Sequence, residues 1–317
     1  MITVVPESTS AGYTPPRRIY STRQRELLPP LSPGVDGTDM KKAEIVAGVS
    51  KQIVWWMGER QKKLAELRHE TMSVNPFLLP LIFGIHQFED FDELAEFLVA
   101  AHLSTGYATG FGKLIDEKIL PNVFGTIKLD KATRRTAPLS MSAFDEIDHI
   151  IPSASNHATK LLSLKAGRWT IQLTMAVQLN KAFEELLKLR DSRRLGTFTF
   201  DEIAVGVFYG TKDTLTDKYD ILRGINRGAN HDVTNLTEHV HVYAGREFWT
   251  WLNGGEQQTQ EWVLEGISQG FEAAEKSMGS LIDLLADFRK EFSQQFQFSV
   301  RPDRTIDWKA IIKKING

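Results

Sequence analysis

An acid and a lysine stand seventeen residues apart, in two apolar segments whose composition is typical of β-strands. Asp148 lies in the segment 144–151, and Lys165 ends the segment 161–165. If the first segment is extended, Glu146 and Asp148 share one face, where two carboxylates repel unless a cation or a proton intervenes. Mg²⁺ takes such oxygen ligands and keeps several waters. A lysine beside it can hydrogen-bond an attacking water near a phosphate, so the pair indicates metal-dependent phosphodiester hydrolysis.

The second acidic position of such a site is missing from this chain. Ser163 stands two residues before Lys165, where metal-dependent phosphodiesterases usually carry a carboxylate. We keep Ser163 as a candidate catalytic residue, and the carbonyl oxygen of Leu164 as a candidate metal ligand with Asp148. The simpler alternative is a surface hairpin in which Asp148 and Lys165 form an incidental ion pair, because an acid and a lysine at this spacing are common by chance.

Another acid could supply the missing metal contact. Glu117 is the first candidate, because it lies in a short helical run after a glycine-rich loop. Glu184 and Glu185 are alternatives on the helix expected after the lysine. The competing interpretation of Glu117 is a solvated helix residue that pairs with Lys113 or Lys118.

The segment 215–231 carries side chains suited to reading DNA bases. Arginine can form two hydrogen bonds with guanine, and asparagine two with adenine, in the major groove. Glycines in the segment allow close approach to a backbone. The alternative is a connecting loop with surface charges. The candidate DNA-binding residues here are Lys218, Arg223, Asn226, Arg227 and Asn230.

A smaller basic cluster precedes the acid. Arg134 and Arg135 follow closely on Lys128 and Lys131. Basic side chains of this kind contact DNA phosphates, which position a protein on a duplex without reading its sequence. Because the net charge of the whole chain is only −2, binding to a polyanion has to rely on such local patches.

These candidates have to be positioned by a mixed α/β fold. Strand-like segments alternate with amphipathic ones, which is typical of such a core. A polar turn over 152–157 is expected to join two strands, and the glycine-rich stretch 106–112 is expected to be a flexible loop. Asp39 is a candidate N-cap for the first helix. We expect helices over 40–70, 88–102 and 168–190, and strands over 142–151, 159–165, 203–209 and 239–243.

The C-terminal third is expected to be helical. From Trp262 to Phe292, apolar residues recur in alternating steps of four and three, as in a coiled-coil seam. Such a seam needs a facing helix, which either the helix 40–70 of the same chain or a second subunit can supply. Both alternatives stay open at this point.

The composition is that of an ordinary globular protein. Of the 317 residues, 42% are apolar and 25% are charged, which is enough for one large domain or two modest ones. The absence of cysteine excludes disulfides, thiolate zinc sites and a cysteine nucleophile. No apolar run is long enough for a membrane span and no signal peptide is recognisable, so we expect a cytoplasmic protein without a membrane partner.

The sequence suggests four parts. Residues 1–39, rich in proline, serine, threonine and glycine with several arginines, are expected to be a flexible extension, either passive or gripping DNA. Residues 40–105 are expected to form a helical region, and 106–250 the catalytic α/β core. Residues 251–317 are expected to form a C-terminal helical region suited to dimerisation.

From about Met40 onwards, the chain resembles type II restriction endonucleases of the PD-(D/E)xK superfamily. More narrowly, it resembles the branch that cuts the interrupted palindrome RGGNCCY. The resemblance covers most of the chain but not residues 1–39. It rests on the segments 73–77, 109–121, 144–149, 161–167, 206–210, 215–219, 221–226 and 241–245.

This resemblance implies a restriction-endonuclease-like α/β (α+β) core, in which helices flank a mixed central sheet, with a helical dimerisation region. It implies a Mg²⁺-dependent homodimer that cuts double-stranded DNA, one strand per subunit, and leaves 5′ phosphates and short 5′ overhangs. By motif, Asp148 would bind the metal and Lys165 would be the catalytic lysine, whereas Ser163 departs from the superfamily pattern. A cognate DNA methyltransferase in the same host is expected, because an unprotected genome would be cut.

Two other functions fit the same residues. A structure-selective DNA repair nuclease would share the core and cut at lesions or branches instead of at one sequence. A non-cleaving dimeric DNA-binding protein would bind duplexes in Mg²⁺ and leave them intact.

Overall fold

The computed structural model describes residues 40–66, 75–152, 159–167, 170–226, 228–275 and 281–316. All of these residues belong to one compact unit. The expected N-terminal extension, the N-cap at Asp39, most of the turn 152–157 and Arg227 lie outside the described residues.

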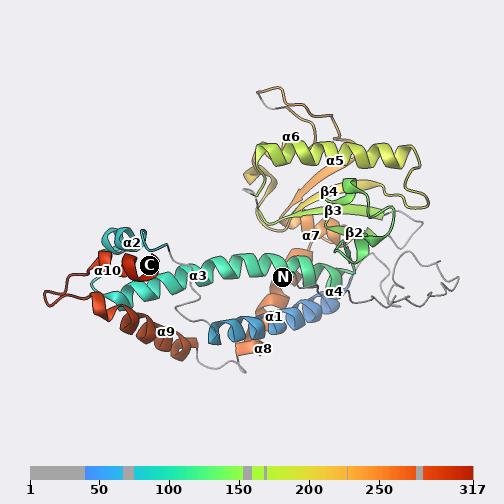
Figure 1. Cartoon of the computed structure of the whole chain (residues 1–317). Helices are drawn as coiled ribbons and strands as arrows, with labels where there is room; N and C mark the ends of the chain where they lie inside the picture. The colour runs from blue at the N-terminus through green and yellow to red at the C-terminus, as the bar shows by residue number, and fades with distance from the viewer. Residues whose placement is uncertain are drawn as a thin grey trace, which may run out of the picture. The chain divides into compact units, whose positions relative to one another are not determined.

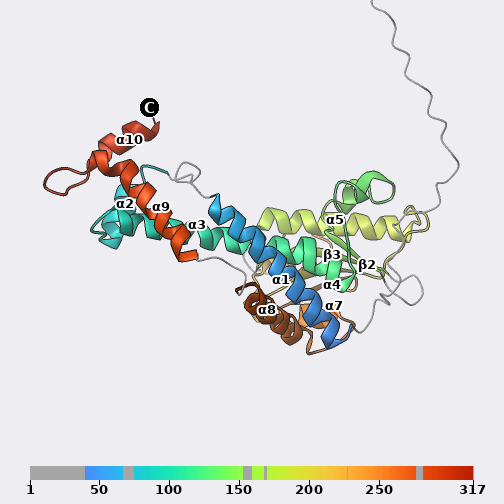
Figure 2. The same cartoon turned by 90° about the horizontal axis from the view of Figure 1, so that it is seen from below.

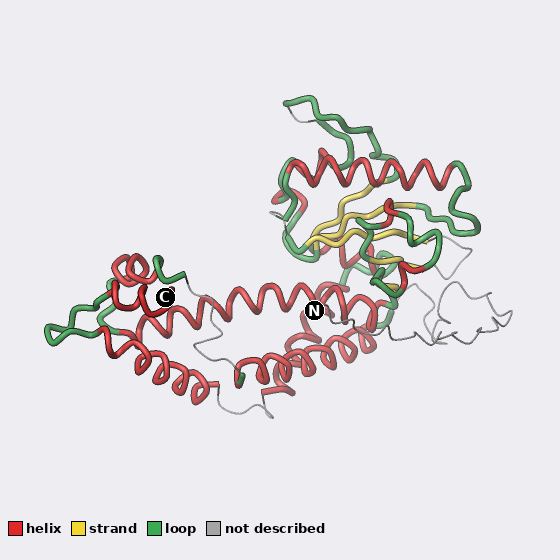
Figure 3. Tube along the Cα trace, in the orientation of Figure 1, coloured by secondary structure: helices red, strands yellow, loops and turns green. Residues whose placement is uncertain are grey.

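Within the described residues, the core is a five-stranded mixed sheet in the order β1-β2-β3-β4-β5 (Figure 1). β1, β2 and β3 pair antiparallel, whereas β3, β4 and β5 pair parallel. The remaining regular structure is helical (Figure 3), so the expected mixed α/β class with a helix-flanked sheet is confirmed. The strands are β1 (Ile127–Lys128), β2 (His149–Pro152), β3 (Thr159–Lys165), β4 (Glu202–Val207) and β5 (Val240–Ala244).

The central strands are apolar because both faces of the sheet are covered. Successive side chains of a strand point to opposite faces, so Leu161 packs into one apolar cluster and Leu162 into another. β4 is buried on both sides, as its continuous apolar run predicts. Its residues Ile203, Ala204 and Val205 have no exposed surface.

One face of the sheet is covered by α5 (Leu173–Asp191), as Figure 1 shows. Leu179, Phe183 and Leu186 recur at helical spacing and are fully buried against the strands. The helix begins later than the expected residue 168, and its first turn is exposed at Met175.

The opposite face is covered by helices that are far apart in the sequence. Gly206 in β4 makes room for the Phe248 ring, because a Cβ atom at this glycine would lie 2.5 Å from that ring. α1 and α8 pack along one another (Figure 2). The apolar cluster on this face includes residues of α1 (Lys42–Ala65), α4 (Leu120–Phe124), α7 (Arg246–Leu252) and α8 (Thr259–Glu275).

The third helix, α3 (Phe91–Leu114), is longer than expected. It begins after the N-cap Asp90, whose carboxylate accepts hydrogen bonds from two backbone N–H groups of the first turn. It then runs through the glycine-rich stretch 106–112 without a break, so the expected flexible loop is wrong. Each glycine lowers helix stability by about 1 kcal/mol, which tertiary packing can outweigh. The helix passes directly into a π-helical turn (Ile115–Ile119) that carries Glu117.

The C-terminal third is helical, but its seam is divided between two helices. α8 packs on α1, whereas α9 (Leu281–Phe296) packs on α3. Intrachain packing therefore buries seam residues such as Ala274 and Phe288, while Phe271 is 50% exposed. α2 (Leu79–His86), α3, α9 and α10 (Trp308–Asn316) share a separate apolar cluster. None of the helices in the described ranges has the length and apolar character to cross a membrane.

Asp148 precedes a strand instead of lying within one. Ser142–Phe144 is a single 3₁₀ turn, and β2 begins only at His149, so the expected strand 142–151 is wrong over its first seven residues. The buried side chains of Phe144 and Ile147 anchor this stretch in the core without strand pairing. Glu146 consequently shares no strand face with Asp148.

Candidate active site

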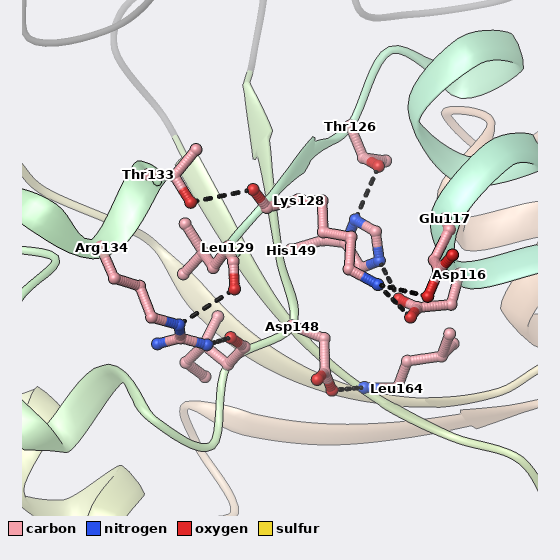
Figure 4. Close-up of polar contacts among 11 residues, drawn as sticks. Asp116, Glu117, Thr126, Lys128, Leu129, Thr133, Arg134, Asp148, His149 and Leu164 are labelled. Atoms are coloured by element: carbon pink, nitrogen blue, oxygen red, sulfur yellow. Dashed lines mark hydrogen bonds and ion pairs between the residues drawn. The ribbon is translucent and has the colours of Figure 1, made fainter. Parts of the chain in front are cut away.

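Asp148 is fixed to the neighbouring strand by both its backbone and its side chain, and Figure 4 shows the side-chain contact. Its N–H donates to the carbonyl of Leu162 over 2.8 Å. Its Oδ2 accepts a hydrogen bond from the N–H of Leu164 over 2.7 Å. The carboxylate therefore takes the place on β3 that a backbone carbonyl would take if β2 started earlier. Its Oδ1 atom has no hydrogen-bond partner within the described residues.

Lys165 lies at the same end of the sheet. Because β2 and β3 run antiparallel with His149 opposite Leu162, the start of β2 and the end of β3 meet there. Burial raises the pKa of Asp148, and the positive charge of Lys165 and the Leu164 hydrogen bond oppose that rise only in part. The sheet thus brings together the acid and the lysine that the sequence singled out.

Ser163 lies between these two residues and is completely buried. It pairs with Val205 of β4, whose side chain belongs to the cluster beneath α5. Its Oγ has no hydrogen-bond partner among the residues described. A buried hydroxyl without a partner costs about 1–3 kcal/mol, and such groups are uncommon enough to mark a candidate functional position.

The carbonyl of Leu164 has the orientation that a metal ligand at this edge requires. The N–H and C=O of one strand residue point to the same side of the strand. The N–H of Leu164 points to Asp148, as its hydrogen bond shows, so the C=O points off the same edge. No residue of β2 lies opposite Leu164, because β2 begins at His149, which pairs with Leu162.

Glu117 does not reach Asp148 directly. Its side chain is 49% exposed, and its nearest charged neighbour is the Lys128 ammonium, 4.0 Å away. The adjacent Asp116 is more deeply placed, at 27% exposure, and it forms an ion pair with Lys128. Its negative charge adds to the rise in the pKa of Asp148. Asp116 is therefore the carboxylate that the fold couples to the candidate metal ligand.

Asp116 also binds His149, which is completely buried. The His149 Nε2 atom lies 2.8 Å from Asp116 Oδ1, and Nδ1 lies 2.9 Å from the Thr126 hydroxyl. A neutral ring donates from Nε2 to the carboxylate and accepts at Nδ1 from the hydroxyl. Burial alone would raise the pKa of Asp116, but the hydrogen bonds from His149 and Lys128 outweigh it and the pKa is lowered.

Sequence reasoning missed the pair Asp116–His149. Their only signal was adjacency, because His149 follows Asp148 and Asp116 precedes Glu117. No spacing rule joins two residues that lie 33 positions apart.

Arg134 has a different contact from the expected DNA phosphate. Its guanidinium donates to the carbonyl oxygens of Leu129, Phe144 and Ile147, at 3.0 Å for Leu129 and 2.6 Å for Ile147. These contacts hold the irregular stretch that leads into Asp148. Arg135 is exposed beside it, and its contact with DNA stays a prediction.

The residues expected to read bases divide into two groups. Arg223 donates from Nε to the carbonyl of Val240, which ties it to β5. Lys218 begins the short helix α6 (Lys218–Ile221) and pairs with Asp217. Asn226 and Asn230 are exposed and hydrogen-bond each other, and Asn226 also accepts from the N–H of His231. The two asparagines therefore close an exposed loop, and their contact with bases stays a prediction.

The oxygen atoms that this edge of the sheet offers fit a Mg²⁺ ion that keeps most of its water ligands. The parts of the chain that are described contain no group of three or more His, Asp or Glu residues placed to hold a metal. In the described part of the chain, Asp148 Oδ1 and the Leu164 carbonyl are the candidate oxygen ligands at this edge. Mg²⁺ keeps several waters and uses one or two carboxylates, so these two oxygens satisfy its minimum.

An apolar cavity of about 600 Å³ opens beside Ala166, the residue after Lys165. Its walls include Phe111, Phe208, Trp249 and Leu264. Walls of this kind offer few donors to a phosphate, so the cavity is not suited to holding the scissile group.

Comparison with protein-family models gives no match for this chain, and no curated protein matches it. Function therefore has to be inferred from the residues themselves. The acid, the lysine and the carbonyl at the open end of β3 are the most informative group among them.

Proposed function

We propose that the protein is a Mg²⁺-dependent type II restriction endonuclease that cuts duplex DNA at a short interrupted palindrome resembling RGGNCCY. The observation that carries this proposal is the meeting of Asp148 and Lys165 at one end of the sheet, with Asp148 bound to the Leu164 N–H. The mixed five-stranded sheet is compatible with a restriction-endonuclease-like core.

The chain's own residues would divide the chemistry between them. Asp148 Oδ1 and the Leu164 carbonyl would hold the ion, which when bound supplies a Lewis acid at the phosphate and lowers the pKa of a coordinated water. Lys165 would place positive charge beside the phosphoryl oxygens and orient the attacking water. The 5′ phosphate end and a short 5′ overhang would result, with one strand cut per subunit.

Asp116 would act on this chemistry indirectly, through the residues that it binds. It holds His149, which is adjacent in the chain to Asp148, and it holds Lys128. We assign it a positioning role in place of a direct metal contact, because two strong donors already occupy its carboxylate.

A homodimer is part of the proposal, because a palindrome presents two equivalent half-sites. An exposed apolar surface supports it. Large apolar side chains in α2 and the turn before it face solvent: Phe77, Leu78, Leu81 and Ile85 are 60%, 47%, 58% and 75% exposed. Contiguous apolar surface of this kind marks interaction sites in soluble proteins. The 262–292 seam is the weaker candidate, because α1 and α3 already cover much of it.

Digestion of a plasmid of known sequence in Mg²⁺, followed by sequencing of the ends, tests the proposal. Discrete cuts at one palindrome are expected. Cuts at lesions or branches would indicate a repair nuclease instead. Intact DNA with a clear mobility shift would indicate a DNA-binding protein without cleavage. Co-expression with the expected methyltransferase should protect the same palindrome.

A further inference from the structure

A second polar site lies in a groove of about 260 Å³ between α1 and the end of α3. The groove combines tryptophan side chains with cations. The residues that line it include Trp55, Trp56, Arg60, Lys63, Lys113 and Lys118.

Two buried donors in this groove have no acceptor. Trp56 Nε1 and Arg60 Nε are shielded from solvent, and neither has a hydrogen-bond partner within the described ranges. A buried N–H left without a partner costs about 1–3 kcal/mol, and more when the group is charged. Since both orphaned atoms are donors, the group that is missing is an acceptor.

The charge of the groove points to an anion. Its four cations face two carboxylates, Glu59 and Glu117. Glu59 is paired with Lys62, at 2.7 Å, and Glu117 lies 4.0 Å from Lys128. In the described part of the chain, no ion pair joins any of the four groove cations to a carboxylate. Positive charge is therefore left over for a ligand.

Gly110 fixes the position of the Arg60 guanidinium. A Cβ atom built on Gly110 would lie 2.9 Å from Nη1 and 3.2 Å from Nη2 of Arg60. The guanidinium thus rests against bare backbone of α3, and its carbon lies 5.5 Å from the centre of the Trp56 ring. A guanidinium held in this way presents its donors as a fork that matches two oxygens of a phosphate.

We propose that this groove binds a backbone phosphate of duplex DNA that flanks the cleavage point. This step rests on the proposed function, because it takes the duplex as the ligand. Side chains connect the groove to the candidate active site. Glu117 lines the groove and neighbours Lys128, which pairs with Asp116, and Asp116 binds His149 next to Asp148. A phosphodiester strand that left the active site along this chain of contacts would meet Arg60.

The test measures how tightly the protein binds a fluorescently labelled 20-base-pair duplex in EDTA. Fluorescence anisotropy gives the binding constant at each of a series of salt concentrations. Arg60→Gln should weaken binding about tenfold. It should also reduce the slope of log K against log salt by about one, the change expected for a single lost phosphate contact. Lys51→Gln is the matched control, because it removes one charge from an exposed position of the same helix.

Gly110→Ala tests whether the position of the Arg60 guanidinium matters, apart from its charge. The added methyl group displaces the Arg60 guanidinium while every charge remains, so binding should weaken. Gly112→Ala is its control, because the same helix offers open space there. Both alanines favour the helix by about 1 kcal/mol, so neither variant should unfold earlier than the wild-type protein.

The outcomes for the groove and for the enzyme are distinct. Unchanged affinity and salt slope in both Arg60→Gln and Gly110→Ala would overturn the groove proposal, even if the wild-type protein cuts DNA. Arg60-dependent binding without any cleavage in Mg²⁺ would support the groove and overturn the nuclease. Wild-type binding of ATP that is lost in Arg60→Gln, with duplex binding unchanged, would assign the groove to a free nucleotide and overturn the DNA contact.

Discussion

At the scale of single residues, the ionised form of Asp148 is destabilised by the fold. Burial raises its pKa above the ordinary value, so the native state favours the protonated acid. A group with a raised folded-state pKa contributes stability below its unfolded pKa and loses it as the pH rises through the folded pKa. A cation at Oδ1 would relieve this penalty.

Asp148→Asn should therefore raise the unfolding temperature in EDTA at neutral pH. The difference from the wild-type protein should vanish as the pH falls below the ordinary aspartate pKa, where both side chains are neutral. Thermal unfolding over a pH series measures this. A gap between the two proteins that is the same at every pH would contradict the raised pKa.

Lys165→Ala should reduce cleavage by about 100-fold or more while duplex binding is retained, because loss of a positioned proton-transfer or charge-stabilising group has effects of that size. Single-turnover cleavage and anisotropy measure the two properties separately. Lys188→Ala is the control, since Lys188 pairs with Glu184 on α5. Full activity in Lys165→Ala would remove this lysine from the mechanism.

Asp116 and Glu117 form a natural pair for comparison. Asp116→Asn should lower the free energy of unfolding by about 1.5–3 kcal/mol, because it weakens charged hydrogen bonds to His149 and Lys128. Glu117→Gln should change it by less than about 0.5 kcal/mol, since that side chain is half exposed. Denaturant unfolding and the Mg²⁺ dependence of cleavage check both. A shifted Mg²⁺ dependence in Glu117→Gln alone would restore Glu117 as the second ligand.

At the scale of elements, Arg134 determines how the chain enters β2. Its guanidinium satisfies carbonyl oxygens of Leu129, Phe144 and Ile147, which have no strand partners. Arg134→Ala should cost about 3 kcal/mol, because several carbonyls lose a charged donor at once. Arg135→Ala should stay within about 0.5 kcal/mol. Urea unfolding measures both variants. If both lose the same free energy of unfolding, the contacts of Arg134 with the three carbonyl oxygens do not contribute to stability.

The entry into β2 also explains why apolar patterns in the sequence predicted only part of the fold. Apolar patterning correctly predicted β3, β4 and β5, because these strands pack between two apolar layers. It wrongly extended β2 backwards over Phe144 and Ile147, which are buried without being in a strand. Burial and extended pairing give similar patterns in a short segment, and the contacts of Arg134 that separate them are non-local.

At α3, by contrast, the glycine content led to a predicted loop where the structure has a helix. The stretch 106–112 has the local composition of a loop, yet packing of the helix outweighs the propensity of its glycines. For the candidate site, Asp148 and Lys165 could be predicted, because both lie near β2 and β3. The pairing of Asp116 with His149 could not, because it depends on where α3 ends.

At the scale of the whole molecule, the proposed dimer gives a measurable prediction. Ile85→Glu should shift a dimer towards monomer in sedimentation, because it places a charge on the most exposed part of the apolar α2 surface. Leu173→Glu is the control, since Leu173 is also exposed but lies on α5. A wild-type protein that is monomeric at all concentrations, with and without DNA, would contradict the dimer.

The continuity of α3 has a mechanical consequence. A helix of 24 residues is about 36 Å long, and this one is anchored against α9 towards one end and delivers Asp116 at the other. A small axial twist imposed on the anchored end would arrive at Asp116 with little loss, since no loop intervenes to absorb it. We therefore expect a change in the apolar cluster shared by α2, α3, α9 and α10 to be passed along α3 to Asp116, and from there to the environment of Asp148.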